Sequence, residues 1–299
     1  KIMNTPSHRQ QAVYNTWQNE NCNILIGAVA GSGKTTTLMG LLEMCKHRTL
    51  FLAFNKSIQE EIQNTINTKK LIQGKAMTMH SLGYTALKSC FSNITVYNSK
   101  KFELVKAVQE ELKPLFKRMK WDKKLALTYT LMDLNDLSRL FLTNDLEDLK
   151  SHLISMDKPY NNHPKMLEIW KCFLSHRAKS YTLDRVKIDF IDMIYLPIHL
   201  NLTIPIYPTY LMIDECQDLN LCQHKLIDKL LSQGTIKKWI AVGDRNQAIY
   251  GFSGAYSSSF EMFHNKPGTV KELPLDINYR SKKAIVDSSK YLTSLKITL

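Results

Sequence analysis

Short apolar runs recur towards both ends of the chain, and they alternate with segments whose apolar residues have helical spacing. The runs cover residues 23–26, 50–54, 76–79, 210–213 and 239–242. Continuous apolar runs of this length, separated by helical stretches, are typical of parallel strands that helices bury on both faces. The pattern therefore predicts an α/β fold with a parallel sheet covered by helices.

The alternation stops in the middle of the chain. Residues 102–108, 125–142 and 166–173 instead have apolar side chains three and four positions apart, a spacing that predicts a helical insertion of roughly a hundred residues. We expect a discontinuous sheet domain of residues 1–82 and 183–281, and a helical insertion subdomain of residues 83–182. Residues 282–299 would begin a second domain.

A glycine-containing turn follows the first apolar run, with the sequence Ala30-Gly31-Ser32-Gly33-Lys34-Thr35-Thr36. A strand, glycines and then Lys-Thr form the P-loop arrangement, in which backbone N–H groups approach phosphates closely. Lys34 can reach the β- and γ-phosphates, and the Thr35 hydroxyl can bind Mg²⁺. Ala28 replaces a glycine of the strict pattern, and looser glycine patterns can merely cap a helix. We predict a nucleoside triphosphate site.

An acidic motif, Asp214-Glu215-Cys216-Gln217-Asp218, follows the run at residues 210–213. Open α/β sheets place their ligand chemistry at the carboxyl ends of strands. Asp214 would hold Mg²⁺, Glu215 would deprotonate the attacking water and Gln217 could contact the γ-phosphate. The alternative is an exposed acidic turn that caps the next helix.

Several further motifs, together with these two, resemble those of the UvrD/Rep-type superfamily 1 DNA helicases, in the family order. They are residues 6–13, Phe54-Asn55-Lys56, Thr78-Met79-His80-Ser81-Leu82, residues 189–194, residues 242–255 and Asn278-Tyr279-Arg280-Ser281. The sequence Phe54-Asn55-Lys56-Ser57-Ile58 favours the F-box DNA helicase branch and the branches encoded by phages or viruses. The resemblance implies a RecA-like domain that uses ATP and Mg²⁺ and binds single-stranded DNA and its junctions with duplex, in repair, replication or recombination.

The resemblance also implies roles for single residues at the nucleotide. Gln10 would read adenine, with Gln11 as the alternative register, and Tyr279 would stack on the base. The loop from Ala30 to Thr36 would bind the phosphates, with Thr35 and Asp214 at the metal. The implied catalytic residues are Lys34, Glu215, Gln247 and Arg280.

A second group of residues would contact DNA: Phe54, Asn55, Lys56, Thr78, His80, Tyr250 and Phe252. Aromatic side chains stack on bases of any sequence, which suits movement along a strand. The alternative for Tyr250, Phe252 and Tyr279 is packing in the core. His80 could contact phosphate or cap a helix, and Met79 stands where many relatives carry Phe.

The chain has 40 Lys and Arg residues and 27 Asp and Glu residues, which give a net charge of +13. This excess of positive charge favours a polyanionic partner. Six basic residues gather around Trp121: Lys113, Lys117, Arg118, Lys120, Lys123 and Lys124. Such a stretch can follow a phosphate backbone, or it can be the solvated face of a helix.

The six cysteines are scattered, and none forms a Cys-x-x-Cys pair. This spacing argues against a zinc knuckle and favours reduced thiols in an intracellular protein of the cytoplasm, the nucleus or a viral factory. No apolar run approaches the ~20 residues of a membrane span, so we expect no membrane partner.

The later family motifs, in a second RecA-like domain, would lie beyond residue 299. We therefore expect a fragment or truncated product that carries half of a two-domain cleft. The predicted function is an ATP-dependent DNA helicase or translocase. One alternative is a non-hydrolysing, ATP-gated accessory protein that binds single-stranded DNA. Another is an unrelated P-loop kinase or transporter ATPase, which the acidic and Asn-Tyr-Arg-Ser motifs disfavour.

Overall fold

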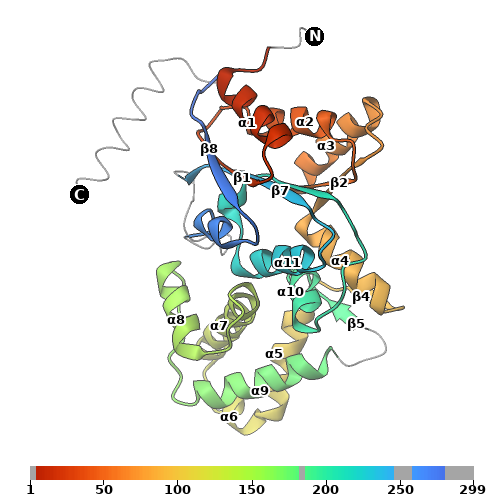
Figure 1. Ribbon diagram of the computed structural model, residues 1–299. Coiled ribbons are helices and arrows are strands. Elements are labelled where there is room, and N and C mark those ends of the chain that lie inside the picture. The colour runs from red at the N-terminus through yellow and green to blue at the C-terminus, as the bar shows by residue number, and fades with distance from the viewer. Residues whose placement is uncertain (1–4, 182–185, 246–257, 280–299) are drawn as a thin grey trace, which may run out of the picture.

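The computed structural model describes residues 5–181, 186–245 and 258–279. Its centre is a six-stranded sheet with the order β3-β2-β6-β7-β1-β8, in which every neighbouring pair is parallel (Figure 1). The strands are β1 (Asn23–Ala28), β2 (Thr49–Ala53), β3 (Gly74–Thr78), β6 (Tyr210–Ile213), β7 (Lys238–Gly243) and β8 (Val270–Leu275). The predicted α/β fold with a helix-covered parallel sheet is confirmed.

Helices cover both faces of this sheet. Ile24 and Ile26 of β1 are buried with α1, α2 and α3, whereas Leu25 between them is buried with α4, α10 and α11. This alternation follows from the two-residue period of a strand. The helices are α1 (His8–Asn19), α2 (Lys34–Met44), α3 (Lys56–Thr68), α4 (Met79–Cys90), α10 (Asp192–His199) and α11 (Leu221–Ser232), with the short 3-10 helices η1 (Cys216–Asp218) and η3 (Glu261–Asn265).

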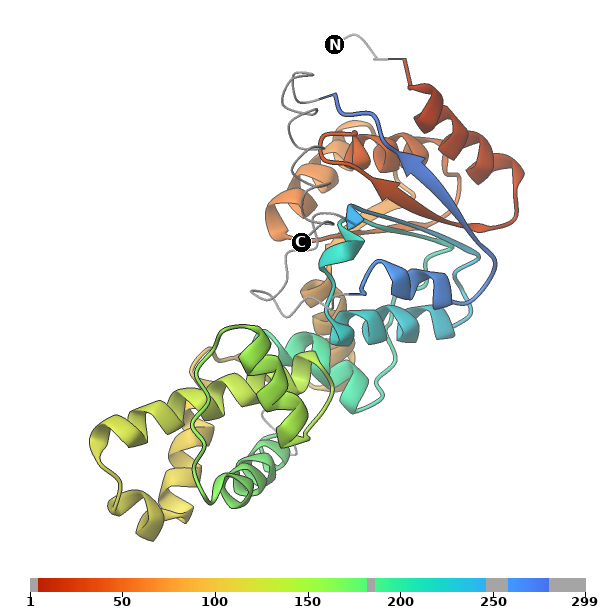
Figure 2. The same ribbon diagram turned by 90° about the vertical axis from the view of Figure 1, so that its left-hand side faces the viewer.

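The middle of the chain forms a helical body that extends away from the sheet (Figure 2). Its core contains no sheet residue and draws only on residues between Leu104 and Phe173. The helices are α5 (Lys100–Glu111), α6 (Lys113–Lys117), α7 (Trp121–Leu140), α8 (Leu146–Ser155) and α9 (Met166–Lys179). Helix α4 runs through the expected boundary at residue 83 and packs in the sheet core, so we propose that the helical insertion begins after α4.

A buried ion network lies where the helical body meets the sheet domain. Arg139 of α7 donates to Asp189 at 2.6 Å and to Asp192 at 2.9 Å, and Lys100 of α5 donates to Asp192 at 2.6 Å. Arg139 and Asp192 are at most 1% exposed. The short parallel strands β4 (Ile94–Val96) and β5 (Val186–Ile188) pair beside it. Removing one partner of such a network leaves a buried charge unpaired, which costs about 3–5 kcal/mol.

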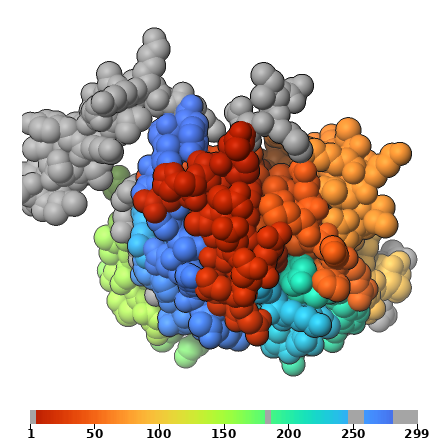
Figure 3. All heavy atoms as spheres, turned by 45° about the horizontal axis from the view of Figure 1, so that its top comes forward, coloured from red at the N-terminus to blue at the C-terminus, as the bar shows by residue number. Residues whose placement is uncertain are grey.

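Strand β8 is absent from the sequence predictions because Lys271, Glu272 and Pro274 interrupt its apolar pattern. It lies at the edge of the sheet beside β1, where a proline is tolerated. Helix α1 and β8 lie side by side on the surface (Figure 3), and Arg9 makes two bonds of 2.9 and 2.8 Å to Asp276 just after β8. In the described ranges, no helix is both long and apolar enough to cross a bilayer.

Candidate nucleotide-binding site

The predicted P-loop connects β1 to α2, and α2 begins at Lys34 as expected. Gly31 and Gly33 have φ angles of 70° and 81°, a region that favours glycine. A Cβ atom at Gly33 would also lie 3.3 Å from Gln10 Nε2. Ser32 is 1% exposed, and its hydroxyl has no hydrogen-bond partner among the described residues. The loop therefore presents a buried polar group as well as backbone N–H groups at the start of a helix.

Two side chains of this loop contact the acidic motif, although the two motifs lie far apart in sequence. Lys34 Nζ lies 2.5 Å from Glu215 Oε2, and the Thr35 hydroxyl donates to Asp214 Oδ2 at 2.9 Å. The contacts form because β1 and β6 end at the same edge of the parallel sheet. The lysine, hydroxyl and paired carboxylates predicted for one site are thus brought together.

Asp214 is not part of an exposed acidic turn. It is 2% exposed, and burial together with the neighbouring Glu215 raises the pKa of its carboxyl to about 6. The next helix is capped by Asn220, so the helix-capping alternative is wrong. Glu215 has a φ of 49°, a left-handed conformation that is costly for this residue type and is concentrated at functional sites.

Gln217 links the acidic motif to the end of β7. Its amide donates to Glu215 at 2.9 Å and to Asp218 at 3.0 Å, and its carbonyl accepts from the backbone of Asp244 at 3.0 Å. Gly243 makes this approach possible, since a Cβ there would lie 2.6 Å from Gln217 Oε1. Sequence reasoning identified Gln217 but not Asp244 as a member of this group.

Gln10 and Tyr279 lie in one pocket beside the P-loop. This pocket of about 460 Å³ is lined by Thr5, Ser7, Gln10, Gly33, Thr36 and Tyr279. Gln11 points elsewhere and bonds Asn15 at 2.9 Å, so the Gln10 register is the one that faces the loop. Tyr279 is 57% exposed, which contradicts the core-packing alternative for this residue.

Further contacts hold the walls of the pocket in place. The carboxamide of Gln10 accepts from Ser7 N at 3.0 Å and donates to the Thr37 hydroxyl at 3.1 Å. The backbone of Tyr279 donates to the carbonyl of Gly31 at 2.9 Å. The Arg9–Asp276 pair ties α1 to the same C-terminal segment. Sequence reasoning missed Thr37 and the Arg9–Asp276 pair, because no local pattern joins residues so far apart.

The first predicted DNA-contact group follows β2. Phe54 is 40% exposed, Asn55 caps α3 through its bond to Ile58 N at 2.9 Å, and Lys56 is a surface residue. Phe54 and Lys56 are therefore accessible to a ligand. Asn55 has a structural role at the helix terminus.

The second predicted group follows β3. Thr78 caps α4, so the capping alternative for His80 is wrong. The His80 ring packs edge-on against Phe190, with ring centroids 5.6 Å apart, and burial lowers its pKa. Phe190 is 57% exposed, whereas Met79 is 3% exposed and unavailable for stacking. Phe190 is thus an accessible aromatic residue. The sequence pointed to it only as part of the motif at residues 189–194, without a role of its own.

Four predicted site residues lie outside the described ranges, namely Gln247, Tyr250, Phe252 and Arg280. The basic stretch lies on α6 and α7, in the helical body. Trp121 is 76% exposed there, and Lys106, Lys113, Lys117 and Lys124 line a pocket of about 510 Å³. Lys124 is half-buried and the others are exposed, and none of them lines the P-loop pocket.

Known proteins resemble the chain in sequence. It is 26% identical over 313 residues to the ATP-dependent DNA helicase Rep of Buchnera aphidicola subsp. Baizongia pistaciae, an alignment that covers 96% of this chain and 42% of the relative. It is 24% identical over 291 residues to the ATP-dependent DNA helicase PcrA of Staphylococcus aureus, with 89% and 37% covered. The chain thus spans less than half the length of these relatives.

A solved structure of Pif1 from Bacteroides sp. in complex with ADP-AlF4 aligns with 95% of this chain and 45% of that one, at 13% identity and a TM-score of 0.38. A family model described as the UvrD/REP helicase N-terminal domain matches residues 7–268, which include the P-loop, the acidic motif and the segments after β2 and β3. The chain therefore belongs to the UvrD/REP helicase N-terminal domain family.

Proposed function

We propose that this chain is the first motor domain of an ATP-dependent DNA helicase or translocase, which couples ATP hydrolysis to movement on single-stranded DNA and to unwinding. The observation that carries the proposal is the convergence of Lys34, Thr35, Asp214 and Glu215 beside the pocket of Gln10 and Tyr279. The family and the names of the Rep and PcrA relatives support it.

The residues around Thr35 fit a magnesium ion. A hydroxyl and a carboxylate 2.9 Å apart are hard oxygen donors of the kind that Mg²⁺ prefers. Thr35 and Asp214 would hold the ion, which when bound neutralises phosphate charge. A cation there would also offset the cost of ionising the buried Asp214.

Other residues of this chain would act on the triphosphate and the attacking water. The backbone of Gly31 and Gly33 and the Lys34 ammonium would bind the phosphates. Glu215 would accept a proton from the attacking water. From the resemblance alone, Gln247 and Arg280 would contact the γ-phosphate.

Gln10 retains the bonding capacity that adenine needs. Its amide has two donors and its carbonyl has two lone pairs, and the described bonds to Thr37 and Ser7 use one of each. The remaining donor and lone pair match the acceptor and amino group on the adenine edge. Tyr279, an exposed residue that lines the same pocket, would stack on the base.

DNA would run over the same edge of the sheet. Phe54 and Lys56 after β2, and the Thr78–His80 segment after β3, follow neighbouring strands and are the described part of this surface. Tyr250 and Phe252 would add stacking contacts from the same loop as Gln247. A loop that contacts both ligands would couple their binding.

Fluorescence anisotropy with labelled single-stranded DNA tests this proposal. A non-hydrolysed ATP analogue should change DNA affinity, and DNA should change analogue affinity by the same factor. Phe54→Ala should weaken DNA binding by about 1–3 kcal/mol, whereas Phe102→Ala, an exposed phenylalanine of the helical body, should not. Equal DNA affinity with and without the analogue would contradict a coupled motor. Coupling without any DNA-stimulated hydrolysis in the full-length protein would favour the accessory alternative.

A further inference from the structure

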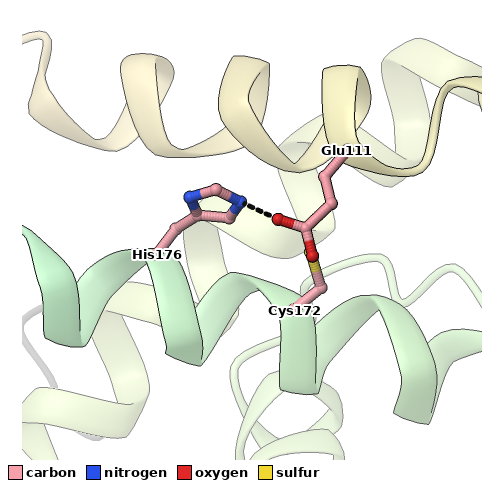
Figure 4. Close-up of side chains that lie close together, drawn as sticks. All are labelled: Glu111, Cys172 and His176. Atoms are coloured by element: carbon pink, nitrogen blue, oxygen red, sulfur yellow. Dashed lines mark ion pairs between the residues drawn. The ribbon is translucent and has the colours of Figure 1, made fainter.

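Three side chains of different chemistry meet between α5 and α9, away from the nucleotide site. Glu111 is the last residue of α5, and Cys172 and His176 lie one turn apart on the same face of α9. Figure 4 shows all three pointing toward one another across the space between the helices. Their ligand atoms lie within 4.8 Å of one another.

The carboxylate of Glu111 contacts both of its neighbours in this cluster. The Cys172 thiol donates to the Glu111 carboxylate, which lowers the pKa of Glu111. His176 Nε2 lies 2.8 Å from Glu111 Oε2, and this contact also lowers the pKa of Glu111. Glu111 thus contacts both other residues, and oxygen, sulfur and nitrogen donors from two helices converge within 4.8 Å.

We propose that Glu111, Cys172 and His176 bind a zinc ion. Zinc accepts sulfur, nitrogen and oxygen donors at about 2.0–2.3 Å in a tetrahedron, so its ligand atoms stand about 3.3–3.8 Å from one another. The ligand atoms already lie within 4.8 Å of one another, and Nε2 and Oε2, now 2.8 Å apart, would move apart to reach that range. Mg²⁺ and Ca²⁺ require oxygen donors and do not suit a thiolate. Water would take the fourth position.

Binding would exchange a proton for the metal. Burial and the hydrogen bond to Glu111 raise the pKa of Cys172 to about 11, so the metal-free residue is a thiol. Zinc forms a bond to the sulfur as the S–H bond breaks, and the proton leaves to solvent. Lys179 and Glu168, also on α9, are the other charged groups that act on this thiol, with opposite signs.

A metal here would fix the end of α5 to α9. Directly after Glu111 the chain enters α6, whose Lys113 and Lys117 line the basic pocket of the helical body. The ion would therefore hold this pocket in one position relative to the core formed by residues such as Val108 and Trp170. The ion would join two helices of the helical body, and its binding would be independent of ATP.

Cobalt serves as a spectroscopic probe of zinc at this site. The chain, stripped with chelator, should bind one equivalent of Co²⁺ with a thiolate charge-transfer band that one equivalent of Zn²⁺ removes. Cys172→Ser should abolish the band. His176→Gln and Glu111→Gln should weaken binding by at least about tenfold, since losing even an outer partner of a metal site costs about 10–100-fold. Cys90→Ser, at an exposed cysteine outside the cluster, should change nothing.

A second measurement on the unaltered chain avoids dependence on variants that fail to fold. Zinc should slow alkylation of Cys172 by iodoacetamide at least tenfold, while Cys90 reacts as before, with each site followed by mass spectrometry of its peptide. Unchanged alkylation of Cys172 at saturating zinc, or cobalt binding without a thiolate band, would overturn the proposal.

Discussion

Lys34 of the P-loop and Glu215 of the acidic motif form an ion pair, with Nζ 2.5 Å from Oε2, at the edge of the sheet where β1 and β6 end. The lysine side chain is 11% exposed and the glutamate side chain 25% exposed. The γ-phosphate of a bound nucleotide would compete with Glu215 for the same ammonium group. The carboxylate that we propose activates water would therefore also affect the affinity for nucleotide.

Replacing Glu215 with glutamine tests this competition. A neutral amide holds Lys34 less strongly, so Glu215→Gln should tighten binding of a non-hydrolysed ATP analogue by about 3–10-fold, or about 0.7–1.4 kcal/mol, the net value of one ordinary hydrogen bond. Isothermal titration calorimetry measures the change, with Glu61→Gln at an exposed position as the control. Weaker binding by Glu215→Gln would mean that the carboxylate assists binding instead of opposing it.

Nucleotide choice should depend on Gln10 and not on its neighbour. The parent should prefer ATP to GTP, and Gln10→Ala should lose most of that preference, because one base-specific hydrogen bond is worth about 0.5–1.5 kcal/mol. Gln11→Ala, which removes only an exposed bond to Asn15, should keep it. Equal affinity of the parent for ATP and GTP would remove the adenine-pocket assignment.

Acid should destabilise the sheet domain through His224. This residue of α11 is 0% exposed, and burial together with Lys266 lowers its pKa from 6.5 to about 3. Below pH 6.5 His224 is protonated in the unfolded chain, whereas in the folded chain it stays neutral down to about pH 3. The contribution of neutral His224 to the free energy of unfolding is therefore fully present above pH 6.5 and falls as the pH drops. The loss is about 2 kcal/mol from pH 7 to pH 5, at 1.36 kcal/mol per pH unit.

Urea unfolding at pH 7 and pH 5 measures this loss. His224→Gln, although less stable overall, should lose about 2 kcal/mol less than the parent between the two pH values. His163→Gln, at a residue outside the core clusters, should behave like the parent. The same pH dependence in parent and His224→Gln would place the acid-sensitive group elsewhere.

The candidate nucleotide site could be predicted from the sequence because its parts are local. A strand, two glycines and Lys34-Thr35 are contiguous, and so are the strand and Asp214-Glu215. A parallel sheet then brings the ends of both strands to one edge whatever their separation along the chain. Gln10 and Gln11 remained undecided because a one-residue choice depends on where α1 begins, and that is set by the Ser7 cap.

Contacts between distant polar residues had no such signal. Lys100, Arg139 and Asp192 resemble surface charges in the sequence, yet they form the buried network under the helical body. Arg9 and Asp276 pair only because β8, a strand with an interrupted apolar pattern, lies against α1. Glu111, Cys172 and His176 were likewise separate in the sequence, where the cysteine spacing argued only against a zinc knuckle.

Titration of the chain with ATP and Mg²⁺ tests the central claim most directly, because every other role depends on this loop binding a triphosphate. Lys34→Ala should weaken binding about 10–100-fold, the range for losing a charged hydrogen bond of about 1.5–3 kcal/mol. Lys46→Ala, at an exposed lysine just after the same helix, should bind like the parent. Removing Mg²⁺ should weaken ATP binding by the parent more than it weakens ATP binding by the Asp214→Asn variant. Binding that is unchanged in Lys34→Ala and insensitive to Mg²⁺ would contradict the account.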